Sequence, residues 1–274
     1  MDNMEFGAGA HEWLTDLAAL SQEAGRAIMR HYLDAESARL TDKSDGSPLT
    51  AADLAAHETI IAGLRRFAPE ILIISEENKD NPPLAPGTPF WLVDPLDGTK
   101  EFLNRNGEFT VNIALISEDK PVLAAVHAPV LGMTYIGQTG LGAWRIKDGE
   151  APQPIRVSAV QGELRVVASR SHSDERTEAL LRKLPHSRVV SAGSSLKFCM
   201  VAEGSADFYP RLGTTMEWDT AAAQCVLEAA GGKVVQCDGS PLRYNKNDRR
   251  NPHFFAIGAW LPVYDEIIAT YRKL

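Results

Sequence analysis

The order of predicted strands and helices constrains the fold of this chain more than any other feature. After about residue 160, short apolar segments typical of strands alternate with segments of helical periodicity. This alternation favours an α/β architecture. Before residue 160, three strand-like segments follow one another, at 109–116, 122–128 and 133–136. A turn at 129–132 separates the last two, so this part of the chain predicts an antiparallel meander.

Further elements follow from periodicity and turn signals. Residues 10–33 predict a helix, because apolar side chains recur there at spacings of three and four. A second helix is expected to begin at Thr50, since Thr50 and Asp53 have the form of a capping box. The polar segment 41–48 predicts a mobile loop, and residues 137–163 predict no element beyond a turn at 137–142. The remaining predicted elements are strands at 71–74, 90–93, 164–168, 188–191, 206–209, 233–236 and 254–257, and helices at 174–184, 196–203, 218–230 and from about 262.

Length and composition predict a globular protein of two domains or of one large domain. The chain has 274 residues, and domains usually contain about 100–200. Hydrophobic residues make up 44% and charged residues 23%, which excludes a disordered or collagen-like chain. The change of pattern predicts domains at residues 1–160 and 161–274.

Charge and cysteine content narrow the class of partner and the compartment. With 28 basic and 36 acidic residues the net charge is −8, which argues against binding to nucleic-acid polymers or to anionic membranes. Three cysteines without C-x-x-C spacing, Cys199, Cys225 and Cys237, predict buried thiols in a reducing compartment. The sequence contains no signal-peptide pattern and no apolar run of about 18 residues. We therefore expect a cytoplasmic protein without a transmembrane segment.

The strongest chemical signal is a set of carboxylates at the ends of predicted elements. Asp94 and Asp97 follow one apolar strand, and Glu76-Glu77 follow another. Asp53 and Asp219 lie in the first turns of predicted helices. Ligands of open sheets bind at strand ends and helix starts. These positions therefore predict a binding site.

The segment 94–97 has the chemistry of a magnesium site. Its two carboxylates can converge on one ion, and the carbonyl of Leu96 between them supplies a third oxygen. Gly98 permits a close backbone approach, and Thr99 offers a hydroxyl and an N–H group. Alone, such a segment more often caps a turn, but the other carboxylates favour metal binding. Glu77 could equally face solvent.

Motifs of other enzyme classes are absent from the sequence. It contains no phosphate-binding G-x-x-x-x-G-K-[ST] loop, no G-x-S-x-G nucleophile elbow and no histidine pair at zinc-ligand spacing. His172 follows the strand at 164–168, where a ligand could reach it. Phosphatases with an aspartyl nucleophile use D-x-D-G-T, whereas Asp94 and Asp97 enclose two residues rather than one.

Three segments resemble the signatures of the inositol monophosphatase family of Mg²⁺-dependent, lithium-sensitive phosphomonoesterases. They are Glu76-Glu77, Asp94–Thr99 and Trp218–Ala222, in the same order and spacing. Within that family the segments 100–112, 193–199 and 209–211 resemble the 3′(2′),5′-bisphosphate nucleotidases. The resemblance implies a layered αβαβα fold, with an antiparallel sheet in an N-terminal α+β half and a C-terminal α/β half.

The resemblance also implies a substrate. It is 3′-phosphoadenosine 5′-phosphate, cleaved to AMP and phosphate, with 3′-phosphoadenosine 5′-phosphosulfate as a second substrate in sulfate assimilation. A peripheral association with the inner membrane and the oligomeric state stay open. The alternatives are an inositol monophosphatase or related sugar phosphatase of the same family, and a metal- or nucleotide-binding protein without activity.

Residue roles follow from the resemblance as expectations. One Mg²⁺ would be held by Glu76, Asp94 and the Leu96 carbonyl, and a second by Asp94, Asp97 and Asp219. A third would lie near Glu76 and the loop around Lys43. Asp53 and Thr99 would act as catalytic residues that orient and deprotonate the attacking water. The residues expected to contact substrate are Glu76, Leu96, Asp97, Gly98, Thr99, His172, Ser194, Lys197, Arg211 and Asp219, of which His172, Ser194, Lys197 and Arg211 would bind the nucleotide and its 5′-phosphate.

Overall fold

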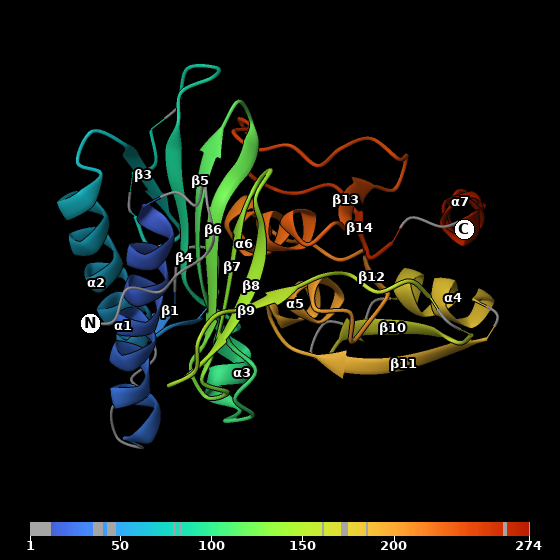
Figure 1. Cartoon of the computed structure of the whole chain (residues 1–274), viewed down its shortest axis with the longest axis horizontal. Helices are drawn as coiled ribbons and strands as arrows, with labels where there is room; N and C mark the ends of the chain where they lie inside the picture. Colours follow the sequence, from blue (N-terminus) through green and yellow to red (C-terminus); the bar gives the residue numbers. More distant parts are fainter. Residues whose placement is uncertain are drawn as a thin grey trace.

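The computed structural model describes residues 12–34, 41–42, 48–78, 80–82, 84–160, 162–170, 175–184, 186–259 and 262–273. Helices and sheets alternate in five layers, as Figure 1 shows. Helices α1 and α2 form one outer layer, two sheets lie on either side of α5 and α6, and α4 and α7 lie at the opposite end. The layered α/β fold expected from the sequence is therefore confirmed.

The first sheet contains seven strands in the order β3-β4-β5-β6-β7-β8-β9. Their bounds are Leu72–Ser75, Phe90–Asp97, Thr110–Ser117, Lys120–Ala128, Met133–Gln138, Gly142–Lys147 and Gln153–Ile155. β3 runs parallel to β4, and every other neighbouring pair is antiparallel. The predicted meander is confirmed, and the sheet extends further than expected.

Five short elements were not expected from the sequence. β8 and β9 lie in the segment 137–163. Its glycines and prolines favour a prediction of turns, although the strands themselves are short and partly buried. The predicted loop 41–48 contributes the two-residue strands β1 (Thr41–Asp42) and β2 (Pro48–Leu49), which pair with each other. The fifth element is the single-turn helix α3 (Thr99–Leu103). Elements this short carry too few residues for a periodic signal.

The outer helices cover the first sheet with an apolar face. α1 (Trp13–Leu33) packs against α2 (Ala51–Phe67) and against β5, β6 and β7. Thr50 caps α2 as expected, since its backbone N–H donates to the Asp53 carboxylate at 2.8 Å and its hydroxyl accepts from the Asp53 N–H at 3.4 Å. This capping box fixes the start of α2 and buries Asp53.

The second sheet contains five strands in the order β11-β10-β12-β14-β13. Their bounds in chain order are Leu164–Ser169 (β10), Ser187–Ala192 (β11), Phe208–Arg211 (β12), Lys233–Gln236 (β13) and Phe254–Ile257 (β14). β10 runs parallel to β11 and β12, whereas β14 is antiparallel to β12 and β13. The outer helices α4 (Glu175–Lys183) and α7 (Pro262–Tyr271) contact each other beside this sheet.

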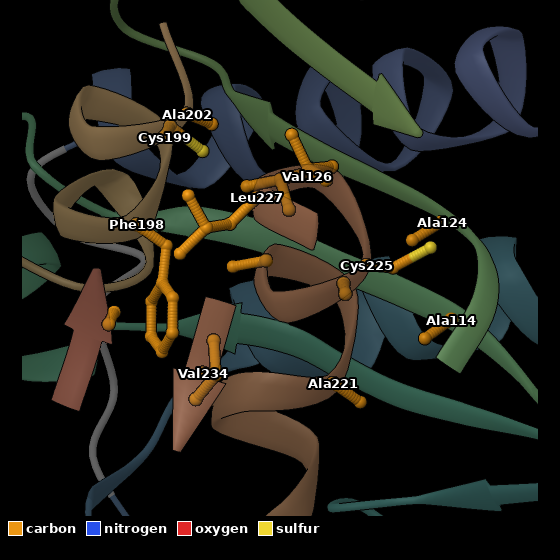
Figure 2. Packing of buried hydrophobic residues seen from close by; sticks show 14 of the residues in the cluster. Ala114, Ala124, Val126, Phe198, Cys199, Ala202, Ala221, Cys225, Leu227 and Val234 are labelled. Carbon is orange, nitrogen blue, oxygen red and sulfur yellow. The ribbon is translucent and has the colours of Figure 1, made fainter. Parts of the chain in front are cut away.

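The middle layer consists of α5 (Leu196–Ala202) and α6 (Glu217–Ala229). α6 contacts β4 to β8 of the first sheet and β13 of the second. Figure 2 shows Cys225 of this helix directed at Ala124 of β6, within a cluster that also contains Phe198 of α5 and Val234 of β13. The boundary predicted at residue 160 falls between the sheets, but one buried cluster joins both parts. The division into two domains stays a prediction.

Candidate active site

The carboxyl end of β4 contains an irregularity that sets the direction of two carboxylates. On β5, Asn112 pairs with Asp94 and Thr110 pairs with Asp97, so three residues of β4 span the length of two on β5. In a regular strand, side chains three residues apart point to opposite faces. A bulge with one extra residue turns them to the same side. The strand thus continues past the predicted end at Val93 and directs Asp94 and Asp97 together.

Four of the predicted carboxylates lie within electrostatic reach of one another. Burial raises the pKa of Asp94 well above its usual range, and the negative charges of Glu76, Asp97 and Asp219 raise it further. Burial also raises the pKa of Asp219 well above its usual range, with Asp97 and Glu76 as additional causes. The pKa of Asp97 is raised by burial as well, although the charge of Lys197 opposes the change. The strand ends and the start of α6 therefore meet as the sequence predicted.

The donor set at this meeting point fits a divalent cation. Asp94, Asp97 and Asp219 are buried beside Glu76, so several carboxyl groups lie close together. Buried carboxylates that repel each other present oxygen ligands and uncompensated negative charge, which is the environment that Mg²⁺ prefers. In the described part of the chain, however, no three acidic, histidine or cysteine side chains are arranged closely enough to hold an ion as they stand.

Thr99 and Asp53, the predicted catalytic residues, lie on neighbouring elements. Thr99 begins α3, which contacts β2, and β2 leads directly into the first turn of α2 that carries Asp53. The Thr99 hydroxyl donates to the Leu96 carbonyl at 3.5 Å. Gly98 precedes α3 with a φ of 94°, a left-handed conformation that favours glycine.

A cavity of about 190 Å³ opens beside these carboxylates. Five residues predicted as metal or substrate ligands line it: Asp97, Ser194, Lys197, Arg211 and Asp219. The remaining polar lining, which includes Glu101, Ser169 and Thr214, was not predicted. The cavity also has an aromatic wall, formed by Phe198, Tyr209 and Phe254. The aromatic wall could not be recognised from spacing, because Phe254 follows Tyr209 by 45 residues and reaches it only through pairing of β12 with β14.

Lys197 brings a positive charge to the cavity. Its ammonium group donates to the Ser194 carbonyl at 2.6 Å and lies 5.3 Å from the centre of the Tyr209 ring. Burial lowers the pKa of Lys197 to about 8, against the attraction of Asp97. An anion bound beside this lysine would stabilise its charged form, because added negative charge raises the lowered pKa toward its usual value.

Arg211 is a second cation on the same cavity wall. Its guanidinium donates to the Thr214 carbonyl at 2.9 Å. The Nε atom of Arg211 is buried, and no acceptor for it lies among the described residues. Buried donors are normally satisfied. Arg211 therefore retains hydrogen-bonding capacity for an anion in the cavity.

Four other predicted positions are Glu76, Glu77, His172 and the loop around Lys43. Glu76 follows β3, and its N–H donates to the Val93 carbonyl at 3.1 Å, which ties it to β4. Glu77 is half-buried, and its N–H lies 3.4 Å from the Ser75 hydroxyl. His172 and the loop around Lys43 lie outside the described residues.

Comparisons with known proteins identify the family of this chain. The sequence pattern of the inositol monophosphatase family matches residues 10–262. The chain belongs to this family. It is 46% identical over 249 residues to the 3′(2′),5′-bisphosphate nucleotidase CysQ of Escherichia coli K12, which covers 88% of this chain and 98% of that protein. Among solved structures, CysQ from Bacteroides thetaiotaomicron is 37% identical with a TM-score of 0.81, covering 93% of this chain and all of that one.

A more distant member of the family has a similar fold. The inositol monophosphatase of Anabaena is 25% identical, with a TM-score of 0.73 and 96% of each chain covered. Within the described residues, no helix is both long and apolar enough to cross a membrane.

Proposed function

We propose that this chain is a Mg²⁺-dependent phosphomonoesterase that removes the 3′-phosphate of 3′-phosphoadenosine 5′-phosphate, giving AMP and phosphate. The sulfated nucleotide, 3′-phosphoadenosine 5′-phosphosulfate, is proposed as a second substrate, and sulfate assimilation as the process. The observation that carries the proposal is one cavity in which acidic and basic side chains lie together: its lining includes Asp97 and Asp219 as well as Lys197 and Arg211. A ligand with two phosphates needs both a cation site and direct basic contacts.

The acidic side chains would hold two ions. In this proposal Glu76, Asp94 and the Leu96 carbonyl hold one Mg²⁺, and Asp94, Asp97 and Asp219 hold the other, with a third near Glu76. The chemistry that Mg²⁺ supplies when bound is neutralisation of phosphate charge and polarisation of the ester. The raised pKa values of Asp94 and Asp219 support this assignment, because buried carboxylates that repel each other are stabilised by a shared cation.

The other residues would act on water and on the nucleotide. Thr99 would orient the attacking water and Asp53 would accept its proton. The Gly98 and Thr99 N–H groups would contact the 3′-phosphate. Ser194, Lys197 and Arg211, together with His172, would bind the 5′-phosphate and nucleoside. The joint action of Thr99 and Asp53 on the water is supported by the proximity of α3 to the strand that precedes α2.

Phosphate release tests this function. The purified protein is expected to release phosphate from 3′-phosphoadenosine 5′-phosphate only when Mg²⁺ is present, and much faster than from inositol 1-phosphate. Faster turnover of inositol 1-phosphate would support the alternative of an inositol or sugar phosphatase. Absence of release from either would leave a binding protein and refute the proposal.

A cytoplasmic location is also proposed. Cys199, Cys225 and Cys237 are buried free thiols, which suits a reducing compartment.

A further inference from the structure

Ser195 lies where the two carboxylate-bearing elements meet. It directly precedes α5, and only 1% of its surface is exposed. Its hydroxyl donates to the Asp219 backbone carbonyl at 2.8 Å. The side chain and the backbone N–H of Ser195 both act to lower the pKa of Asp97, so Ser195 also lies beside that carboxylate. One small residue thus contacts the end of β4 and the start of α6 at once.

Asn112 holds Ser195 from the opposite side. Its side-chain NH₂ donates to the Ser195 hydroxyl at 3.0 Å and lies 3.5 Å from the Asp97 carboxylate. Asn112 is itself 1% exposed and pairs with Asp94 across the bulge. The pair therefore connects the irregular end of β4 to α6 through side chains from two further elements, β5 and the turn before α5.

Ser195 does not belong to the described lining of the cavity, although its neighbour Ser194 does. Substrate would contact Ser194, whereas Ser195 contacts the residues that carry the acidic groups. Its serine hydroxyl is oriented by a donor on one side and an acceptor on the other, so its direction is fixed. This arrangement suits a residue that positions the acidic groups rather than one that contacts the substrate.

We propose that Ser195 and Asn112 are positioning residues that set the separation of Asp97 and Asp219, and with it the affinity of the metal site. The inference rests on the proposed function, since it assumes that these two carboxylates bind Mg²⁺. Hydrogen-bond partners of metal ligands typically change metal affinity or activity by about 10–100-fold when they are removed.

The test measures Mg²⁺ binding directly by calorimetry without substrate, and by the increase in melting temperature that Mg²⁺ causes. Ser195→Ala is expected to weaken Mg²⁺ binding by about 10–100-fold. It should also lower kcat at fixed Mg²⁺ more than it changes KM for the nucleotide. Asn112→Ala should have a similar effect. Because the two residues act as a unit, the double variant should lose much less than the sum of the single losses.

Ser205→Ala is the matched control. Ser205 follows the other end of α5, is exposed, and its hydroxyl donates to the Met200 carbonyl at 3.0 Å. This variant should bind Mg²⁺ as the wild type does. Wild-type affinity in Ser195→Ala overturns the positioning role. If Ser195→Ala does not fold, wild-type affinity in Asn112→Ala overturns it instead. A wild-type protein that neither binds Mg²⁺ nor releases phosphate refutes the proposed function itself.

Discussion

The contact between Gly137 of β7 and α6 offers a sharp test of how the fold positions the site. Replacing Gly137 with alanine would place a Cβ atom 2.8 Å from the Val226 Cα and 3.2 Å from the Cys225 carbonyl oxygen. Carbon atoms pack at about 3.5–4.0 Å. The gap between strand and helix must therefore widen by about 0.7–1.2 Å. The obstructing atoms are backbone, so no change of rotamer relieves the clash.

This displacement lowers the free energy of unfolding. Overpacking typically costs about 1–3 kcal/mol. At about 2–4 °C per kcal/mol, the melting temperature of Gly137→Ala should fall by about 2–12 °C. Val226 lies seven residues after Asp219 in the same helix, about 10 Å along its axis. A helix moves as a rigid body over this distance, so Asp219 should shift with it. A misplacement of about 1 Å can lower kcat/KM by about 100-fold.

The assay is thermal unfolding together with Mg²⁺-dependent phosphate release. Gly140→Ala is the control, because Gly140 lies in the turn after β7 with a φ of 80° and no atom within 4 Å of an added Cβ. It should lose about 1–2 kcal/mol through backbone strain and keep its kcat/KM. If Gly137→Ala keeps the wild-type kcat/KM, or loses no more of it than Gly140→Ala, then the contact between β7 and α6 does not position Asp219.

Three further predictions concern charge in the site. Asp94→Asn should abolish phosphate release yet raise the melting temperature of the metal-free protein, because it removes one of several repelling charges; full activity would contradict the metal site. Lys197→Met should raise KM for the bisphosphate at least tenfold with a smaller effect on kcat, and an unchanged KM would exclude Lys197 from the phosphate site. The pKa of Lys197 is about 8 and its charge is present below that pH, so KM should rise between pH 7 and pH 9. Lys197→Arg should remove this rise, because arginine stays charged throughout, and an identical pH profile would assign the effect to another group.

The elements with a clear local signal were predicted well. The bounds of β13 and β14 agree with prediction, and the capping box at Thr50 begins α2 as expected. α6 begins one residue earlier than predicted. The strand ending at Asp97 was predicted too short, since an Asp-Pro pair normally ends a strand and only pairing with β5 shows that this strand continues through a bulge.

The site was predictable where its residues follow buried strands or begin helices. Asp97 and Asp219 line the cavity for that reason. Asn112 and Ser195 lie in segments that carry the family resemblance, but their contact could not be predicted, because they meet across 83 residues. Glu101 was missed for a related reason: it lies on the single turn of α3, and only tertiary packing brings it to the cavity.

The placement of α6 between the two sheets determines how the chain can be divided. This helix comes from the second half of the sequence, yet it covers strands β4 to β8 of the first half. A fragment ending near residue 160 would expose that sheet face to water, and the remaining fragment would expose the apolar side of α6. Each piece alone should aggregate, whereas the two mixed should reassemble. The intact chain should accordingly melt in one cooperative step rather than domain by domain.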